Sequence, residues 1–274
     1  MPKAYCTIRD APHYRRQAFD AGLRACGFTV HDFLPSQPPG PRDVMVIWNR
    51  YGDKEPAADA WERQGGTVIV AENGYIGRDA QGRQHYALAI HGHNGSGTWP
   101  AGGPERWQAL GIELKPWRRE GEHVLVCPNR SFGTRTTAMP HDWERTIVRE
   151  LRRHTKRPIR VRPHPGTSAP ARLLADDLVN AWCVVIWASS CGVHALAAGI
   201  PVICTAPHWI CKAAADLDWL TLNQACVRDR RQQVFERLAW AQWRIEEIER
   251  GEPFRVLLGH VLPDSRQAES AAAV

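Results

Sequence analysis

The sequence predicts an α/β protein made of two Rossmann-like domains that face a cleft. Strand-like apolar runs alternate with helical segments from the N-terminus to Tyr75, and the same alternation begins again near Glu122. The clearest stretch is Trp182 to Thr205, in which a strand, a turn of small residues, a short helix and a second strand follow one another. A length of 274 residues suits two such domains better than one.

The expected elements of the first half are strands at 4–8, 28–33, 44–48 and 67–71, a helix that carries Phe19, Leu23 and Cys26, and a helix at 57–64. Residues 77–104 are rich in glycine, and we expect them to form an irregular loop over the cleft. Ligands of parallel sheets bind beyond the carboxyl ends of the strands, so Asp10, His13, Asn49 and Glu72 are expected at one edge.

The expected elements of the second half are strands at 124–127, 159–162, 183–187 and 200–204, and helices at 141–154, 169–180 and 230–250. The helix at 141–154 places Trp143, Ile147 and Leu151 on one face. The terminal helix at 230–250 carries one apolar stripe and is expected to pack across the protein; the stripe consists of Val234, Leu238, Ala241, Ile245 and Ile248.

We expect the domain boundary in the segment LKPWRREG, which ends at Gly121. The first domain would then span residues 1–116, the second 117–262, and a flexible tail 263–274. No apolar run is long enough to cross a membrane, and the first residues lack the apolar core of a signal peptide. These features predict a cytoplasmic protein.

The cysteines and histidines predict no metal site. The eight cysteines form no C-x-x-C pair and lie mostly in apolar runs, so we expect them to be small buried hydrophobic residues in a reducing compartment. His91 and His93 have no carboxylate or cysteine at a ligand spacing. The nearby Gly95-x-Gly97 lacks the third glycine of a dinucleotide fingerprint.

Polar residues follow three strands of the second half. Arg130 and Ser131 follow the first strand, Arg162 and His164 the second, and the turn Ser189-Ser190-Cys191-Gly192 the third. Because parallel strands end at one edge, these loops should meet there. Arginines, hydroxyl groups and a helix N-terminus all bind phosphate oxygens, so the loops predict a site for a diphosphate or a nucleotide.

The motifs RPHP, ending at Pro165, and SSCGVHALAAGIPVI, starting at Ser189, resemble the carboxyl-terminal half of GT-B nucleotide-sugar glycosyltransferases. The similarity is to bacterial capsule-polysaccharide transferases related to Kdo transferases. The segment Glu72-Asn73-Gly74-Tyr75 is similar to their E-D-G-F segment, with Asn73 in place of an aspartate. The resemblance covers about two-thirds of the chain and implies a GT-B-like arrangement.

The resemblance implies that His164, Ser189, Ser190 and Gly192 hold the donor nucleotide, with His194 where the family has an acidic residue. The implied donor is a nucleotide sugar, with a UDP-sugar expected first and a CMP-sugar as the alternative. Arginines and helix N-termini would neutralise the leaving phosphate in place of a metal or beside one.

An inverting transfer needs one base that takes the acceptor proton, and the candidates are Glu72, Asp10 and His13. A retaining mechanism through a covalent intermediate, by analogy with glycosidases, is the alternative, and the sequence does not choose between them.

A net charge of +6 indicates a polyanionic partner or substrate. Six basic residues in and after the helix at 141–154 could follow a phosphodiester backbone; they are Arg145, Arg149, Arg152, Arg153, Lys156 and Arg157. We therefore expect a 5-hydroxymethylpyrimidine in DNA as the acceptor, as for phage enzymes that glycosylate such bases in the host cytoplasm. A capsule or surface polysaccharide is the alternative acceptor, and a non-catalytic nucleic-acid-binding protein is the alternative function. The oligomeric state stays open.

Overall fold

The computed structural model describes residues 1–169, 172–215, 222 and 230–259. The chain forms two compact units, which we describe separately. The first unit comprises residues 1–93, 97–102 and the described residues from 240 onward, and the second comprises 94–96 and 103–239. Both units are α/β and contain parallel strands, as expected.

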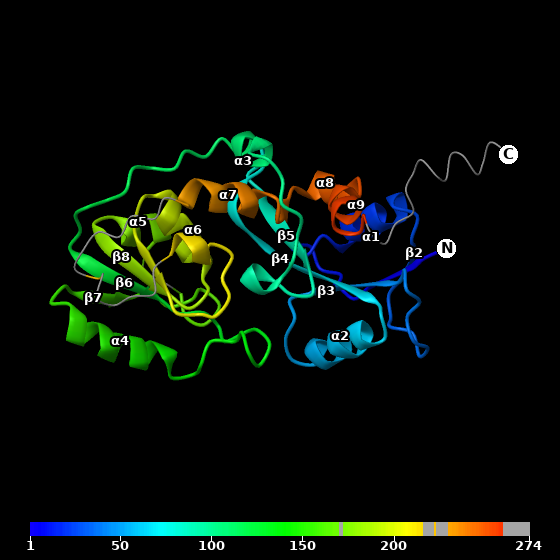
Figure 1. Ribbon diagram of the computed structural model, residues 1–274, viewed down its shortest axis with the longest axis horizontal. Helices are drawn as coiled ribbons and strands as arrows, with labels where there is room; N and C mark the ends of the chain where they lie inside the picture. The colour runs from blue at the N-terminus through cyan, green and yellow to red at the C-terminus, as the bar shows by residue number, and fades with distance from the viewer. Residues whose placement is uncertain (170–171, 216–221, 223–229, 260–274) are drawn as a thin grey trace. The chain divides into compact units, whose positions relative to one another are not determined.

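The first unit contains a six-stranded sheet in the order β10-β5-β4-β3-β1-β2 (Figure 1). Its strands are β1 (Lys3–Cys6), β2 (Thr29–His31), β3 (Val44–Trp48), β4 (Thr67–Arg78), β5 (Gln84–Ile90) and β10 (Gln242–Trp243). Strands β1 to β4 run parallel, whereas β5 is antiparallel to β4 and to β10. Its helices are α1 (Arg16–Ala25), α2 (Lys54–Arg63), α8 (Ile245–Glu249) and α9 (Glu252–Leu257).

Helices cover both faces of this sheet. One face forms an apolar cluster with α2, consisting of Tyr5, Met45, Ile47, Ala58, Trp61, Val68 and Val70. On the other face, Phe19 of α1 packs edge-on against Tyr86 of β5 and Phe254 of α9, with ring centroids 6.0 and 6.4 Å apart. Successive side chains of a strand point to opposite faces, so these contacts also assign the neighbouring residues of β4 and β5 to a face.

The expected irregular loop at 77–104 was wrong in part, because it contains β5 and the end of β4. A tight turn joins the two strands: the Asp79 side chain accepts backbone hydrogen bonds from Gln81 and Arg83 at 3.0 and 2.7 Å. Gly74 permits the close pairing, since a Cβ atom there would lie 2.8 Å from the His85 carbonyl carbon. The buried strand was missed because the glycines on both sides of its apolar run led to the expectation of a loop.

The single helix expected at 230–250 was also wrong. The segment forms α7 (Arg231–Ala239), then β10, then α8. The side chain of Gln242 causes the interruption, because its Oε1 atom accepts hydrogen bonds from the backbone N–H groups of Tyr75 and Ile76, at 3.0 and 3.2 Å. Its Nε2 group donates to the Ile76 carbonyl at 2.7 Å. The buried amide thus joins β10 to β4.

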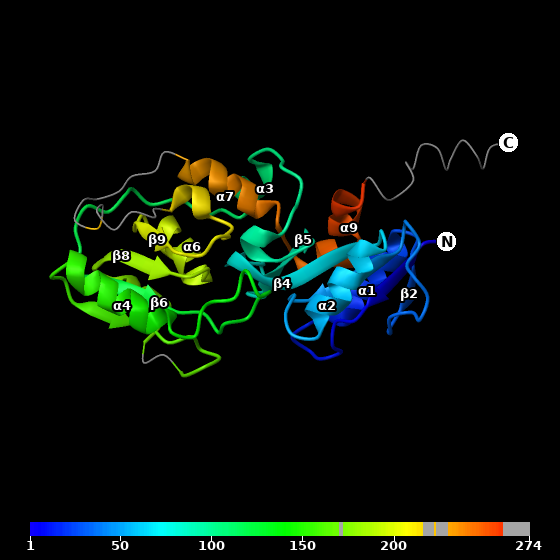
Figure 2. The ribbon, with the colours of Figure 1, turned by 60° about the horizontal axis from the view of Figure 1, so that its bottom comes forward.

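The second unit contains a four-stranded, fully parallel sheet in the order β7-β6-β8-β9 (Figure 2). Its strands are β6 (His123–Cys127), β7 (Ile159–Val161), β8 (Ala181–Ile186) and β9 (Val202–Cys204). Its other elements are η1 (Asn94–Ser96), α3 (Glu105–Ala109), α4 (Trp143–His154), α5 (Leu174–Leu178), α6 (Ser190–Ala197), η2 (Lys212–Ala214) and α7.

The predicted apolar face of α4 is confirmed. Trp143, Ile147 and Leu151 are buried and pack in one cluster with Val126 and Val185 of the sheet. The helix expected at 169–180 is shorter than predicted, because only α5 is helical in its described part. Residues 170 and 171 lie outside the described residues.

The two units divide the chain differently from the expected domains. The second unit begins at Gly103 rather than at residue 117, because Trp107 of α3 packs against Phe235 of α7 with ring centroids 4.9 Å apart. The chain returns to the first unit at Trp240. The expected tail at 263–274 lies outside the described residues. Within the described chain, none of the helices combines the length and apolarity that crossing a bilayer requires.

We predict that Gln242→Leu lowers the free energy of unfolding by about 3 kcal/mol, because a nearly isosteric leucine leaves buried backbone groups of Tyr75 and Ile76 without a partner. Denaturant titration followed by circular dichroism measures this change. Gln233→Ala is the control, since Gln233 is exposed on α7 and its loss should change the free energy by less than about 0.5 kcal/mol. Equal effects of the two substitutions would show that the amide is dispensable.

Candidate functional site

Three loops of the second unit meet at the carboxyl edge of its sheet. β6 pairs in parallel with β7 and with β8, and the last pairs in register are Val126 with Val161 and Cys127 with Ile186. The polar residues that follow these strands therefore leave the sheet side by side, as the sequence predicts.

The start of α6 lies at this edge and is capped by a serine side chain. Ser189 is 6% exposed, and its Oγ atom caps the helix by accepting a hydrogen bond from the Cys191 N–H at 3.2 Å. The Ser190 side chain is exposed beside it. A helix N-terminus carries partial positive charge, so this turn favours an anion. Gly192 packs inward, since a Cβ atom there would lie 2.6 Å from Ile186 Cδ1.

Asn129 ties two of the loops together, a role that the sequence analysis missed. Its side-chain oxygen, after β6, accepts a hydrogen bond from the Ala188 N–H, after β8, at 3.2 Å. The Ala188 carbonyl in turn accepts from the Asn94 side chain at 2.9 Å. The sequence does show an asparagine directly after a strand, which could have indicated a role in the loop. Its hydrogen-bond partner could not be predicted, because it depends on the pairing of β6 with β8.

Arg130 and His164 lie next to each other. The Arg130 side chain is exposed, and its guanidinium carbon lies 4.4 Å from the ring centroid of Phe132. A Cβ atom on Gly166 would lie 2.6 Å from Arg130 Cδ, so the glycine leaves room for the arginine. Ser131 adopts a φ of 51°, which turns the chain sharply after Arg130.

His164 is a neutral donor in this arrangement. Burial, together with the charge of Arg130, lowers the pKa of His164, which disfavours the imidazolium. Its Nδ1 atom accepts a hydrogen bond from the Gly166 N–H at 2.9 Å. The proton of the neutral ring therefore resides on Nε2, which can donate to an anionic oxygen.

Arg162 is held inside the loops. Its side chain is 10% exposed and forms an ion pair with Asp177 of α5. It also donates to the Arg172 carbonyl at 2.7 Å. Arg162 thus stabilises the loop after β7. His194 lies exposed on the second turn of α6.

In the first unit, Glu72 is the first residue of β4 beyond the parallel pairing with β3, which ends at Ala71 and Trp48. Its Oε1 atom accepts a hydrogen bond from the Tyr75 hydroxyl. Glu72 shares a face with Val70, which belongs to the α2 cluster.

Asp10 and His13 are exposed in the segment after β1. The His13 carbonyl accepts a hydrogen bond at 2.8 Å from Tyr86, which pairs with Asn73. Asn73 points to the face opposite to that of Glu72. Glu72 and the Tyr86 side chain that contacts the His13 segment therefore lie on opposite faces of the sheet, although both segments follow parallel strands that end at the same edge.

His13 borders a pocket of about 370 Å³ in the first unit, a site that the sequence analysis did not identify. Its lining residues are His13, Arg15, Asn73, Arg83, Gln84, Tyr86 and Ile245. Two of them, Gln84 and Tyr86, come from β5, which was predicted as a loop, and this is why the pocket was missed. Arg83 is occupied there by ion pairs with Asp79 and Glu246.

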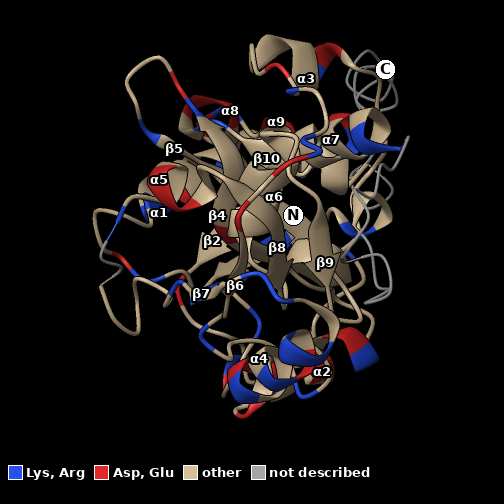
Figure 3. Ribbon diagram, turned by 90° about the vertical axis from the view of Figure 1, so that its left-hand side faces the viewer, with Lys and Arg blue, Asp and Glu red and all other residues tan. Residues whose placement is uncertain are grey.

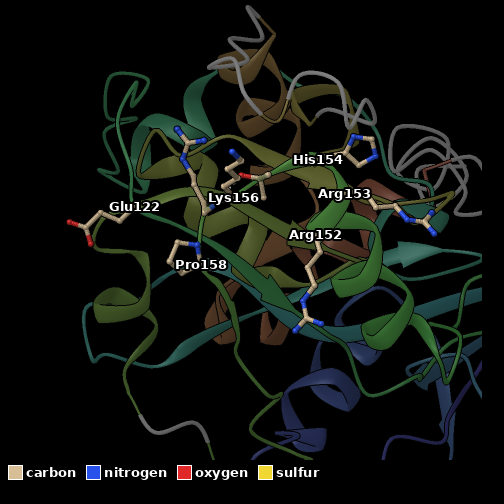
Figure 4. Close-up of a pocket in the computed structure, with 8 residues that line it drawn as sticks. Glu122, Arg152, Arg153, His154, Lys156 and Pro158 are labelled. Atoms are coloured by element: carbon tan, nitrogen blue, oxygen red, sulfur yellow. Dashed lines mark hydrogen bonds between the residues drawn. The ribbon is translucent and has the colours of Figure 1, made fainter.

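A basic surface lies at the opposite edge of the second sheet, where β6 and β7 begin. It surrounds a pocket of about 640 Å³ near the end of α4, and Figure 3 shows the basic segments of this helix in blue. Arg157 lies over the Trp182 ring at 4.1 Å, and Arg153 pairs with Glu150 at 3.1 Å. Arg152 and Arg153 extend in different directions (Figure 4), so their charges do not converge on one point.

His91 and His93 have protein partners. His91 Nδ1 lies 2.8 Å from Glu62 Oε1, and the His93 ring accepts a hydrogen bond from the Arg50 N–H at 3.4 Å. In the described part of the chain, no group of three or more His, Cys, Asp or Glu side chains could hold a metal ion.

Comparisons with known proteins agree with this architecture. No protein-family model and no curated protein sequence matches the chain. The chain is similar to the solved structure of KpsC beta Kdo 2,7 transferase from Thermosulfurimonas dismutans, with a TM-score of 0.55 and 16% identity over 92% of this chain and 99% of that one. It is also similar to the KpsC beta Kdo 2,4 transferase of the same organism, with a TM-score of 0.54 and 15% identity over 88% and 90% of the two chains. At these identities the similarity shows the fold alone.

We predict that Arg130→Gln raises the pKa of His164, because the nearby positive charge is removed while the burial stays. Titration of the imidazole resonances by NMR measures the midpoint. Arg145→Gln removes an equal charge from an exposed position on α4 and should leave that midpoint unchanged. An unchanged midpoint in Arg130→Gln would place the guanidinium away from the ring.

Proposed function

We propose that this protein is a glycosyltransferase that moves a sugar from a nucleotide-sugar donor to a hydroxyl group, with its two units in a GT-B-like arrangement. One observation carries the proposal: the capped N-terminus of α6, the neutral His164 and the exposed Arg130 occupy one edge of a parallel sheet. These groups suit a phosphate leaving group. The similarity in fold to two Kdo transferases supports the same proposal.

In the proposed mechanism, the second unit stabilises the departing nucleotide. Arg130 neutralises charge that develops on the leaving phosphate, while the N–H groups at the start of α6 and the Nε2–H of His164 donate to its oxygens. Arg162, held by Asp177, keeps the loop after β7 in place. We propose a UDP-sugar as the donor, with a CMP-sugar as the alternative.

We propose Glu72 as the base that takes the acceptor proton in an inverting transfer. It lies at the end of the parallel part of β4, and the hydrogen bond that its Oε1 atom accepts from the Tyr75 hydroxyl orients the carboxylate. Asp10 and His13 are the alternatives, and His13 borders the pocket of the first unit.

We propose a surface glycan as the acceptor. The similarity in fold to the Kdo transferases supports this acceptor. The basic surface that could follow a DNA backbone lies at the sheet edge opposite the three loops of the proposed donor site, which favours a glycan over DNA. A 5-hydroxymethylpyrimidine in DNA is the second candidate, because the basic residues after α4 suit a phosphodiester backbone.

We predict that one nucleotide of a panel of UDP, CMP and GDP stabilises the protein, by about 2.7 kcal/mol at a concentration of 100 times its Kd. Arg130→Ala should weaken this binding about ten-fold or more, because it removes a charged hydrogen-bond donor. Thermal unfolding and calorimetry measure both effects. Arg145→Ala is the matched control. If no nucleotide binds, the proposed donor site is wrong, and a non-catalytic nucleic-acid-binding function becomes the better hypothesis.

We predict that Glu72→Gln keeps the nucleotide affinity but lowers turnover by about a hundred-fold or more, since the amide cannot accept the proton. The assay follows labelled sugar from the matching nucleotide sugar to a glycan acceptor and to DNA that contains 5-hydroxymethylpyrimidines. Asp10→Asn and His13→Gln serve as comparisons. Full activity of Glu72→Gln would move the role to one of them, and label on DNA alone would exclude the glycan.

A further inference from the structure

A strongly basic surface lies at the edge of the second sheet where its strands begin, and the proposed glycosyl transfer gives it no role. We call it the basic edge. It comprises four side chains from the last turn of α4 and the loop to β7, which are Arg152, Arg153, Lys156 and Arg157. They line the pocket of about 640 Å³, and among its described lining residues only Glu122 is acidic.

Much of this positive charge is not neutralised within the described part of the protein. Arg152 and Lys156 are exposed, and neither forms an ion pair with a described residue. The Glu122 carboxylate accepts a hydrogen bond from the Asn180 side chain at 3.3 Å instead. Arg149 is also exposed, three residues before Arg152 on α4. Like charges at that spacing disfavour a helix, so the fold itself does not require them.

Arg157 holds the loop after α4 against the sheet. Its guanidinium carbon lies 4.1 Å from the ring centroid of Trp182, and its Nε group donates to the Gly121 carbonyl at 3.3 Å. The loop that carries Lys156 is therefore fixed at the edge of the sheet, while the Lys156 side chain is exposed to solvent.

Two exposed apolar residues flank the start of β6 at the same edge. Pro158 is exposed before β7, and its carbonyl accepts a hydrogen bond from the Val124 N–H at 2.9 Å. Val179 is 57% exposed before β8, and the carbonyl of the next residue, Asn180, accepts from the Glu122 N–H at 2.8 Å. Because β6 lies between β7 and β8, these two segments are about 10 Å apart. The basic edge thus has uncovered apolar neighbours.

We propose that the basic edge docks the protein on a bilayer that contains anionic lipids. The side chains of Arg152 and Arg153 diverge (Figure 4), which suits headgroups spread over a plane rather than one phosphate ion. Clusters of Lys and Arg attract anionic headgroups, and apolar side chains beside them enter the boundary between headgroups and acyl chains. A nucleic-acid backbone would engage the charges and leave Pro158 and Val179 in water.

This docking surface leaves the three loops of the proposed donor site accessible, because they lie at the opposite edge of the same sheet. The proposal does not depend on the proposed function, since docking is measured without a nucleotide or an acceptor.

The experiment sediments the full chain with vesicles of phosphatidylglycerol and phosphatidylcholine in a ratio of about 3 to 7, and with vesicles of phosphatidylcholine alone. We expect binding to the anionic vesicles only, and release as the salt concentration rises, because salt screens the charges. Equal binding to both kinds of vesicle, or binding to neither, would overturn the proposal.

A double variant tests the position of the surface. Arg152→Gln with Lys156→Gln should weaken vesicle binding about ten-fold or more, since each basic residue contributes a factor of about five. Arg42→Gln with Arg63→Gln removes the same charge from exposed positions of the first unit and should bind like the unaltered protein. Equal losses in the two double variants would show that net charge, rather than the basic edge, causes the binding.

A further variant distinguishes a bilayer from a nucleic acid. Val179→Ser should weaken vesicle binding about three-fold, because an apolar side chain no longer enters the bilayer boundary. The same variant should bind an unmodified DNA duplex as the unaltered protein does, and the duplex at equal phosphate concentration should not displace the protein from vesicles. If the duplex displaces it and Val179→Ser binds vesicles normally, the basic edge is a nucleic-acid surface and the proposal is wrong.

Discussion

The parallel pairing of β6 with both β7 and β8 is the interaction on which the candidate site depends. Because of this pairing, three neighbouring strands end at one edge of the sheet. Arg130, His164 and Ser189 therefore follow the strands at the same edge, although they are far apart in the sequence. The hydrogen bond between Asn129 and Ala188 then fixes the loops to each other. A shift in the register of these strands would separate the side chains and N–H groups that could bind a phosphate.

Much of the fold follows from local patterns. The run Val44–Trp48 and the apolar face of α4 were predicted correctly, because in both cases one element's own sequence determines which residues are buried. The strand β5 and the interruption after α7 depend on partners elsewhere. Nothing near Gln242 reveals that its amide will bond to the backbone of Tyr75 and Ile76, 166 or more positions away.

The candidate site, like the fold, could be predicted from the sequence only in part. That the three loops would meet was predictable from the alternation of strands and helices, whereas the side-chain contacts within them were not. Arg162 belongs to the right loop but pairs with Asp177. Glu72 and His13 were expected at one edge, and the strands before them do run parallel, but that expectation did not include the alternation of side chains along β4, which assigns their surroundings to opposite faces of the sheet.

The return of the chain to the first unit has a consequence for biosynthesis. Residues 103–239 emerge from the ribosome before β10 does, so the described strands of the second unit are available while the first sheet still lacks its edge strand. The first unit, most of which precedes residue 103, is thus completed after the strands of the second. A premature stop codon shortly before the codon for Gln242 would leave β4 and β5 of the nascent protein with an unpaired edge and an uncovered backbone, which is a target for chaperones and proteases.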